Sequence, residues 1–268
     1  MDRRPTWAPE DVDVERPSIA RVYDYYLGGS HNFAVDRAFA DRVLRLMPGT
    51  TTAAQANRAF LRRAVRHLCE IGIRQFIDLG SGIPTAGNVH EVAHSVDPTT
   101  KVVYVDIDPV AYAHSRAILA DDPHTTVIRA DLRQPAEVLA DPQLREQIDF
   151  DRPVGVLLVS VLHFVSNEER PADIVAGYAS ATAPGSHLVI SHASVEGTTE
   201  ASSEALDLYK RSSANVVTRT AKEVAGLVSG LSLVDPGVVQ LTQWRPESPD
   251  ETTSWEEIPV LAAVARRE

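Results

Sequence analysis

The order of hydrophobic and polar residues ahead of residue 72 is typical of helices. Apolar residues near helical spacing, such as Phe39, Val43 and Met47, predict amphipathic segments. We expect helices over residues 19–26, 36–47 and 52–71, with glycine or proline after each. Ser18 stands at the N-cap position of the first helix, and residues 1–17, which contain prolines and several acids, predict an extended arm.

From residue 75 onwards, short apolar runs alternate with helical segments. The runs predict strands at residues 75–79, 102–105, 126–129, 154–159 and 188–191, and the segments predict helices at residues 86–94, 109–119, 135–139, 168–183 and 220–227. Residues 154–159 are apolar almost throughout, as expected of a central parallel strand covered on both faces. Two further strand-like runs, 233–242 and 258–265, flank a polar loop at 245–254 and predict a closing hairpin. The pattern therefore predicts an α/β fold.

The amino-acid composition argues against several functional classes. The chain has 268 residues, of which 44% are hydrophobic, and its net charge is −11. This acidic balance argues against broad binding to nucleic acid, which needs clusters of lysine and arginine. No apolar run approaches the roughly 20 residues that span a bilayer. The N-terminus lacks the apolar centre of a signal peptide, so the sequence predicts a cytoplasmic protein without a membrane segment.

Cys69 is the only cysteine, which excludes an intrachain disulfide and a cysteine-rich metal site. The histidines outside the predicted site have no acids at metal-ligand spacing; these are His94, His114, His124 and His187. We therefore expect no metal centre.

The turn after the first predicted strand is the strongest local signal for a ligand. It reads Asp78-Leu-Gly-Ser-Gly82, and glycine at Gly80 and Gly82 would let a ligand approach the backbone closely. Many turns from strand to helix contain such glycines for steric reasons only, so that alternative stays open. Where a dinucleotide fingerprint has its third glycine, this chain has Thr85, which weighs against a nicotinamide cofactor.

The second predicted strand ends in an acid, Asp106, whose carboxylate could accept both hydroxyls of a ribose. Asp108 competes for this role. However, Asp108 precedes Pro109, and this pair is typical of an N-cap followed by proline at the first helical position. We assign Asp108 to capping and Asp106 to the ribose.

Taken together, these motifs resemble the class I S-adenosylmethionine-dependent methyltransferases. The resemblance over residues 60–268 rests on the Asp78–Gly82 turn, Asp106, Ala130-Asp131-Leu132 and the terminal hairpin. It implies a Rossmann-like, seven-stranded, mostly parallel sheet whose last strand is antiparallel. A closer resemblance over nearly the whole chain, carried by residues 16–33 and Ile83-Pro84-Thr85, is to an actinobacterial group classified as S-adenosyl methyltransferases and long labelled a domain of unknown function.

The resemblance implies a division of the chain and a set of cofactor contacts. Residues 1–58 would form an N-terminal arm and helical lid, and residues 59–268 the cofactor-binding domain. Asp78 would help to hold the ammonium of S-adenosyl-L-methionine, and Asp131 would accept from the adenine amino group. The alternatives are a carboxylate that binds turn amides at Asp78 and an N-cap at Asp131. The expected cofactor-binding residues are Asp78, Gly80, Ser81, Gly82, Asp106, Ile107, Asp131, Leu132 and Ser160.

Two segments could act on the methyl acceptor. The rim after the fourth strand, residues 160–164, contains His163, whose imidazole could serve as a general base; a structural histidine is the alternative. The segment from Tyr23 to Phe33 combines tyrosines with a polar glycine turn and could form a lid, or its tyrosines could simply pack a helix. The expected catalytic residues are His163, His31 and Tyr26, and the expected substrate contacts are Tyr23, Asn32, Phe33 and His192.

The sequence hypothesis is therefore methyl transfer from S-adenosylmethionine to a small molecule. Two alternatives remain open at this stage: a regulatory protein that binds the cofactor without turnover, and an NAD-linked oxidoreductase. The sequence gives no indication of the oligomeric state.

Overall fold

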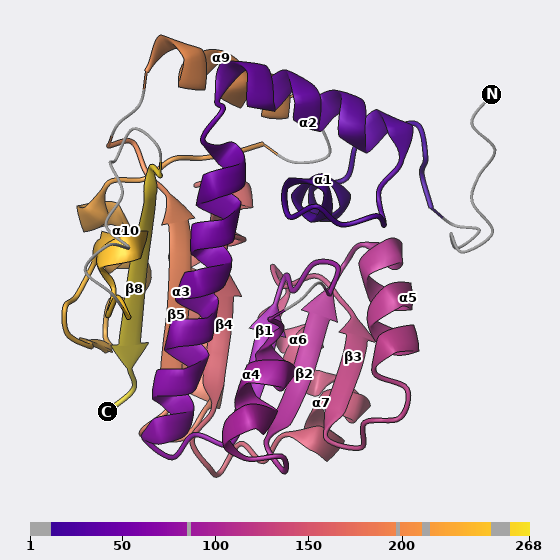
Figure 1. Cartoon of the computed structure of the whole chain (residues 1–268). Helices are drawn as coiled ribbons and strands as arrows, with labels where there is room; N and C mark the ends of the chain where they lie inside the picture. Colours follow the sequence, from indigo (N-terminus) through magenta and orange to yellow (C-terminus); the bar gives the residue numbers. More distant parts are fainter. Residues whose placement is uncertain (1–11, 85–86, 197–198, 211–214, 248–257) are drawn as a thin grey trace.

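An eight-stranded sheet forms the centre of the molecule (Figure 1). The computed structural model describes residues 12–84, 87–196, 199–210, 215–247 and 258–268. Most of the expected arm, residues 1–11, and the expected loop beyond residue 247 lie outside this range, as do Thr85 and Ala86. Within the described residues, no helix has both the length and the apolar character needed to cross a bilayer.

The strand order is β3-β2-β1-β4-β5-β8-β6, with β7 also paired to β8. Strands β1 to β5 are parallel, whereas β8 is antiparallel to β5, β6 and β7. The expected parallel sheet with an antiparallel last strand is therefore confirmed. The strands are β1 (Gln75–Leu79), β2 (Lys101–Asp106), β3 (Thr125–Arg129), β4 (Gly155–Val159), β5 (His187–Ala193), β6 (Ser232–Leu233), β7 (Val239–Gln240) and β8 (Val260–Arg266).

The eighth strand arises because the expected run at residues 233–242 is interrupted. β6 pairs with Ala265 and Arg266 of β8, and β7 pairs with Leu261 and Ala262. Residues 234–238 thus lie opposite only two residues of β8, Ala263 and Val264. The additional residues form a turn in which the Gly237 amide donates to the Val234 carbonyl oxygen at 2.9 Å. Because Pro236 has no amide hydrogen to donate, the run cannot continue as one paired strand.

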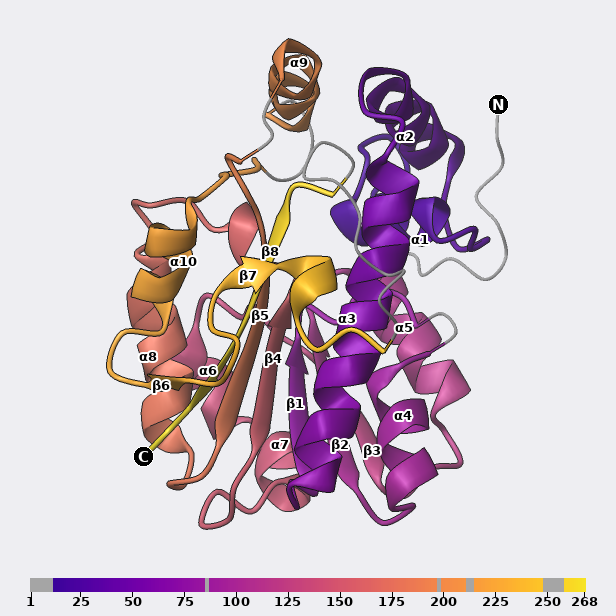
Figure 2. The same cartoon turned by 60° about the vertical axis from the view of Figure 1, so that its left-hand side comes forward.

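Helices cover both faces of the sheet (Figures 1 and 2). One face carries α3 (Thr50–Glu70), α4 (Val89–Val96) and α5 (Pro109–Ile118), and the other carries α6 (Pro135–Ala140), α7 (Pro142–Gln147), α8 (Pro171–Ala181) and α10 (Ala221–Leu227). Short 3-10 turns are η1 (Leu162–Phe164) and η2 (Leu241–Gln243). The two layers bury alternate residues of the same strands: Ile77 and Leu158 pack on one side, Phe76 and Leu157 on the other.

A separate group of helices lies across the carboxyl ends of the strands (Figures 1 and 2). We call α1 (Ile19–Tyr26), α2 (Ala34–Leu46) and α9 (Glu200–Tyr209) the lid. Its helices share a small core with the start of α3, formed by Val22, Tyr26, Ala40, Val43, Ala54 and Ala205. Sequence analysis predicted the N-terminal lid helices but neither α9 nor α7. The proposed division at residue 58 stays a prediction; it falls inside α3, a single helix.

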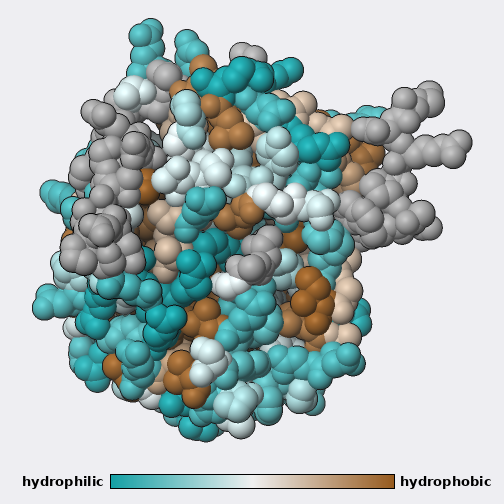
Figure 3. Space-filling model, viewed as in Figure 1, coloured by the Kyte–Doolittle hydropathy of each residue, from teal (hydrophilic) through white to brown (hydrophobic). Residues whose placement is uncertain are grey.

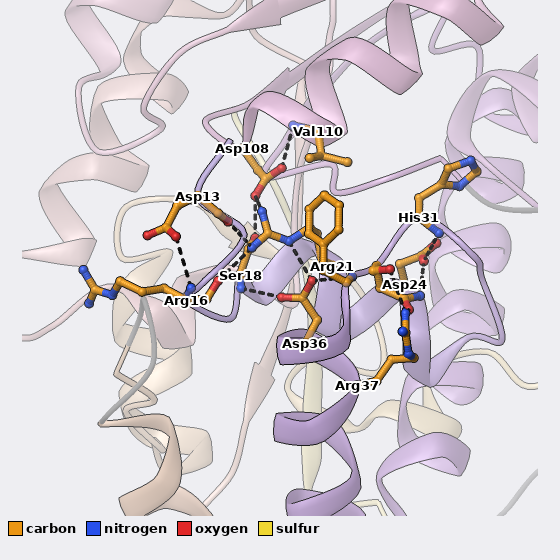
Figure 4. A network of polar contacts seen from close by, with 12 residues as sticks. Asp13, Arg16, Ser18, Arg21, Asp24, His31, Asp36, Arg37, Asp108 and Val110 are labelled. Atoms are coloured by element: carbon orange, nitrogen blue, oxygen red, sulfur yellow. Dashed lines mark hydrogen bonds and ion pairs between the residues drawn. The ribbon is translucent and has the colours of Figure 1, made fainter. Parts of the chain in front are cut away.

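A buried ion pair fixes the lid to the loop after β2 (Figure 4). The Arg21 guanidinium donates to Asp36 at 2.8 Å, and both side chains are almost fully buried. Arg21 also lies 3.7 Å from Asp108 and donates to the carbonyl oxygens of Asp13 (3.0 Å) and Arg16 (2.8 Å). This one guanidinium therefore joins the described end of the arm, α1, α2 and the β2–α5 loop.

Ser18 occupies the N-cap position of α1, as expected, but its side chain does not cap the helix. The Ser18 hydroxyl makes no capping bond to α1 and donates instead to the carboxylate of Asp108. Its backbone amide donates to Asp36 at 2.9 Å. The buried acids of the ion network thus outcompete the local cap.

Removing one partner of this network should destabilise the fold strongly. We expect Asp36→Ala to lower the free energy of unfolding by about 3–5 kcal/mol, because it leaves Arg21 buried without its carboxylate. The exposed acid Asp41 on the same helix bonds to Tyr25, so Asp41→Ala should cost less than about 1 kcal/mol. Urea denaturation of both variants measures the difference, and equal losses would contradict the assigned role of Asp36.

Candidate functional site

The candidate site lies at the carboxyl ends of the parallel strands, under the lid. Here β1 and β4 are neighbours, and the chain runs from them toward opposite edges of the sheet. Such a reversal opens a crevice outside the strand ends, which is where α/β sheets bind ligands. A cavity of about 780 Å³ occupies this place. All the cofactor-binding residues expected from the sequence line it, from Asp78 at β1 to Ser160 at β4.

The two glycines of the turn after β1, Gly80 and Gly82, have different surroundings. Both adopt left-handed backbone angles, φ +71° at Gly80 and +67° at Gly82. A Cβ atom on Gly80 would overlap the side chain of Val161, so this glycine permits close packing. A Cβ on Gly82 would meet no protein atom within 4 Å, because this glycine faces the cavity. Gly82 is therefore the position at which a ligand can approach the backbone.

Asp106 joins the ends of β1 and β2. Its carboxylate accepts from the Gly82 amide at 2.7 Å and from the Asp108 amide at 2.8 Å. Burial raises the pKa of Asp106 to about 6, against the opposing effect of these two hydrogen bonds. Asp108 accepts from the amides of Val110 (2.8 Å) and Ala111 (3.1 Å), so its assignment as the N-cap of α5 is confirmed.

Asp78 and Arg58 form an electrostatic pair without a direct contact. Burial raises the pKa of Asp78 to about 7, although the charge of Arg58 opposes the shift. Arg58, which comes from α3, is also buried, and its Nε finds no hydrogen-bond partner among the described residues. Sequence analysis did not identify Arg58. The available signal was a charged residue next to the apolar stretch of α3 around Phe60 and Leu61.

Asp131 follows β3 and is held by Arg133. Arg133 Nε lies 2.9 Å from one carboxylate oxygen of Asp131, and Nη2 lies 2.7 Å from the other. Burial raises the pKa of Asp131, but the hydrogen bonds from Arg133 outweigh it and leave the pKa below its ordinary value. The N-cap of α6 is Gln134, so the capping alternative for Asp131 is wrong. Asp131 therefore stays ionised beside the cavity.

A chain of hydrogen bonds links the rim after β4 to the lid. The Ser160 amide donates to the Ser191 hydroxyl (2.8 Å), which donates to the Asn57 side chain (2.6 Å). Asn57 in turn donates to the Tyr23 hydroxyl (2.9 Å), and Tyr23 donates to the Ala54 carbonyl oxygen (3.2 Å). Ser160 has a φ of +54°, which is uncommon for serine. The chain of bonds holds this rim and α1 in a fixed relation.

His163 lies on η1 and lines the cavity. Its Nδ1 atom is buried and finds no partner among the described residues. Burial, and then the neighbouring His192 and Arg219, hold the pKa of His163 well below its ordinary value. The imidazole is therefore neutral near pH 7, and its buried Nδ1 atom has no hydrogen-bond partner among the described residues.

Tyr26 also lines the cavity, but its hydroxyl lies 3.1 Å from the hydroxyl of Tyr209. Burial, and then Tyr209, raise the pKa of Tyr26 above its ordinary value. Tyr26 therefore keeps its proton near pH 7, which disfavours the expected role of base. Tyr209 comes from α9, which explains why sequence analysis missed it.

The structure does not bring His31, Asn32 or Phe33 to the cavity. Asn32 donates to Asp24 at 2.8 Å, and the His31 ring lies 3.8 Å from that of His114. Phe33 is buried against Ile83 and Val110, in a cluster beside α5. The polar turn that suggested a binding loop instead satisfies hydrogen bonds within the lid.

His192 is likewise kept out of the cavity lining. Its Nδ1 lies 2.8 Å from the Ala193 carbonyl oxygen, and its Nε2 lies 2.6 Å from Arg219. Since Arg219 also donates to the carbonyl oxygens of Leu162 (3.2 Å) and Val165 (3.0 Å), this pair supports η1. The geometry places His192 behind His163, with both ring nitrogens engaged.

Comparison with known proteins identifies the family. A sequence model described as S-adenosyl methyltransferase matches residues 5–268. The chain belongs to the S-adenosyl methyltransferase family. No curated protein sequence matches the chain significantly.

Solved structures agree with this assignment. A candidate methyltransferase from Thermobifida fusca YX is 41% identical, covering 98% of this chain and 100% of its own, with a TM-score of 0.92. A DUF574 family protein from Streptomyces avermitilis MA-4680 is 36% identical, covering 96% and 99%, with a TM-score of 0.91. Human N-acetylserotonin methyltransferase, solved with its cofactor, shares the fold at 15% identity, 94% and 63% coverage, and a TM-score of 0.51.

The protein is thus an S-adenosylmethionine-dependent methyltransferase with a class I fold. The NAD-linked alternative is wrong. The cavity fits the cofactor of this methyltransferase, because Gly82 lines it with open space at its Cβ position and the Ser81 hydroxyl beside it has no partner among the described residues. The buried acids Asp78 and Asp106 also suit a ligand that carries positive charge and ribose hydroxyls.

Gly82→Ala should separate cofactor contact from backbone strain. We expect it to weaken S-adenosylmethionine binding at least about tenfold, because the new methyl group enters the cavity. Gly72→Ala is the control, since Gly72 also has a positive φ and no atom within 4 Å of a Cβ, but lies after α3, away from the cavity. Each should cost about 1–2 kcal/mol of stability. Calorimetry should show lost affinity for the first variant only; unchanged binding would contradict the placement of Gly82.

Cofactor binding should depend on pH through the buried acids. Without ligand, Asp78 and Asp106 have pKa values raised to about 7 and about 6, so both are largely protonated at pH 5. If binding requires their carboxylates, affinity rises between pH 5 and 8, by up to about tenfold per pH unit for each group below its pKa. Asp106→Asn should weaken binding at pH 8 and flatten the rise. A wild-type affinity that is constant over this range would refute the requirement.

Proposed function

We propose that this methyltransferase modifies a small molecule held in the same cavity as the cofactor. The observation that supports this best is the continuity of the cavity, which runs from the acids after β1, β2 and β3 to His163 and the lid. Its volume of about 780 Å³ is typical of small-molecule sites, which span roughly 300–1,000 Å³. The acidic net charge of −11 also argues against a nucleic-acid acceptor.

Each polar part of the cofactor would bind a side chain of opposite charge or a hydrogen-bond acceptor. Asp106 would accept the ribose hydroxyls, replacing its hydrogen bonds to the turn amides. Asp78 would hold the ammonium and Arg58 the carboxylate of the methionine end, which explains why these two buried charges lie near each other without pairing directly.

The adenine end would lie toward β3. Asp131, kept ionised by Arg133, would accept from the adenine amino group. The apolar side chains of Ile107 and Leu132 also line this part of the cavity, and they would cover the faces of the ring. Ile107 is 57% exposed as the structure stands, so its apolar surface is available for such a contact.

When bound, S-adenosylmethionine supplies a methyl group already activated as a sulfonium. The residues of the chain then have to orient the acceptor, exclude water and take up a proton. His163 would accept the proton of the acceptor hydroxyl, since its side chain lines the cavity and the imidazole is neutral near pH 7. The acceptor oxygen gains the methyl carbon as the carbon–sulfur bond breaks. Arg219 and His192 would act through position only, by holding η1.

The lid would exclude water during transfer. Its residues Tyr23, Met47 and Tyr209 line the cavity opposite the strand ends. The Arg21 network and the Tyr23–Asn57–Ser191 bonds tie this layer to the sheet at two separate points. A closed, dry cavity strengthens every electrostatic contact inside it.

Turnover with small acceptors tests this proposal. We expect the protein to form S-adenosylhomocysteine from S-adenosylmethionine with the low-molecular-weight fraction of a bacterial metabolite extract. His163→Gln should lower kcat by about 10²-fold or more without changing cofactor affinity. His124→Gln, altered at the opposite end of β3, should behave as wild type. Product formed only with the protein fraction would refute a small-molecule acceptor, and cofactor binding without any product would favour the regulatory alternative.

A further inference from the structure

The cavity is divided by charge into two halves. Among the described lining residues, the charged ones belong to the arm, α1, α3, or the ends of β1, β2 and β3 and the loops that follow them, where the cofactor is proposed to bind. The other half lies between the lid and the ends of β4, β5 and β8; we call it the acceptor half. Its lining includes Tyr26, Met47, Phe164, Leu206, Tyr209 and Val260, and none of its described lining residues is charged.

The absence of charge from this described lining limits what can be buried there. Moving an ionised group from water into such a half costs several kcal/mol unless an opposite charge compensates it. Arg219, a buried cation behind η1, is already bound by His192 and by backbone oxygens. An acceptor with a carboxylate, phosphate or ammonium would therefore find no opposite charge in the described lining of this half.

The remaining chemistry of the acceptor half favours a ring compound with a hydroxyl group. Tyr26, Tyr209 and Phe164 present aromatic surface, and Met47 offers a side chain that adapts to irregular shapes. On the face seen in Figure 3, apolar residues reach the surface only as separate spots among polar ones, so the apolar lining is not a patch exposed on that face. His163 also lines the cavity here, and its Nδ1 atom has no hydrogen-bond partner among the described residues.

We propose that the methyl acceptor is an uncharged, largely apolar ring compound whose hydroxyl group binds His163. This rests on the proposed function, because it assigns the acceptor to the half of the cavity that the cofactor leaves free. The acceptor half selects by excluding charge, and His163 fixes which oxygen faces the methyl group.

Two fluorescent probes with one ring system test the exclusion of charge. N-phenyl-1-naphthylamine is neutral, whereas 8-anilino-1-naphthalenesulfonate adds a sulfonate to the same rings. In the presence of saturating S-adenosylhomocysteine, the neutral probe should bind at least about tenfold more tightly. Equal binding, tighter binding of the sulfonate, or no binding of the neutral probe would overturn the proposal.

A matched pair of variants on α9 locates the probe. Leu206 lines the cavity, so Leu206→Trp should weaken the neutral probe at least about tenfold by filling the acceptor half. Glu204 is exposed on the same helix, so Glu204→Trp should leave binding unchanged. If Leu206→Trp keeps its probe affinity while remaining folded by circular dichroism, the probe lies elsewhere and the proposal fails.

Displacement of the neutral probe tests the role of His163. We expect 1-naphthol to displace it at least about tenfold better than naphthalene, and His163→Leu should remove that advantage. Equal displacement by both compounds in the wild type would refute the hydroxyl contact. Calorimetry with S-adenosylmethionine distinguishes failure of the proposed function from failure of the acceptor class. If the wild-type protein does not bind the cofactor, the proposed function is overturned. If it binds the cofactor but does not discriminate between the neutral and the charged probe, only the acceptor class is overturned.

Discussion

The burial of carboxylates at the ends of parallel strands is the constraint on which this site depends. Asp78 and Asp106 end apolar strands whose neighbours on both faces exclude water, and burial raises both pKa values. The fold stabilises Asp106 with two backbone amides, whereas Asp78 makes no direct contact with Arg58, whose Nε has no hydrogen-bond partner among the described residues. Such an arrangement costs stability in the free protein and suits a ligand that brings complementary charge. Under the proposed function, the acids at this edge of the sheet would contribute to cofactor binding.

The lid depends on the same edge. Arg21 connects Asp36 of α2 to Asp108, the residue that caps α5 and lies two positions after Asp106. The lid and the loop that carries Asp106 are therefore parts of one buried polar network, and a displacement of either would leave buried charge unsatisfied. Continuity of α3 from the lid into the sheet layer adds a covalent link between them. This coupling makes the lid a structural wall of the cavity as well as its cover.

Under the proposed function, the two halves of the cavity would contribute different kinds of interaction to methyl transfer. In the proposed function, ionic and hydrogen-bonding groups at the ends of β1, β2 and β3 would orient the cofactor. Apolar and aromatic groups under the lid would remove water from the acceptor, and His163 would be a polar contact for it. Because the methyl group of the cofactor is activated before it arrives, this separation is sufficient: alignment and desolvation contribute more than covalent chemistry by the protein.

Local sequence determined the strand ends and their acids. An apolar run followed by aspartate specifies a strand and its first polar residue, and a parallel sheet must place all such residues at one edge, which is why Asp78, Asp106 and Asp131 were predictable. The tertiary structure alone decided which lid residues face the cavity. The Tyr26 hydroxyl contacts that of Tyr209, which lies far along the chain. The His192 ring contacts Arg219 and does not line the cavity. Such contacts join segments that are distant in sequence, and their packing leaves no local periodic signal from which they could be predicted.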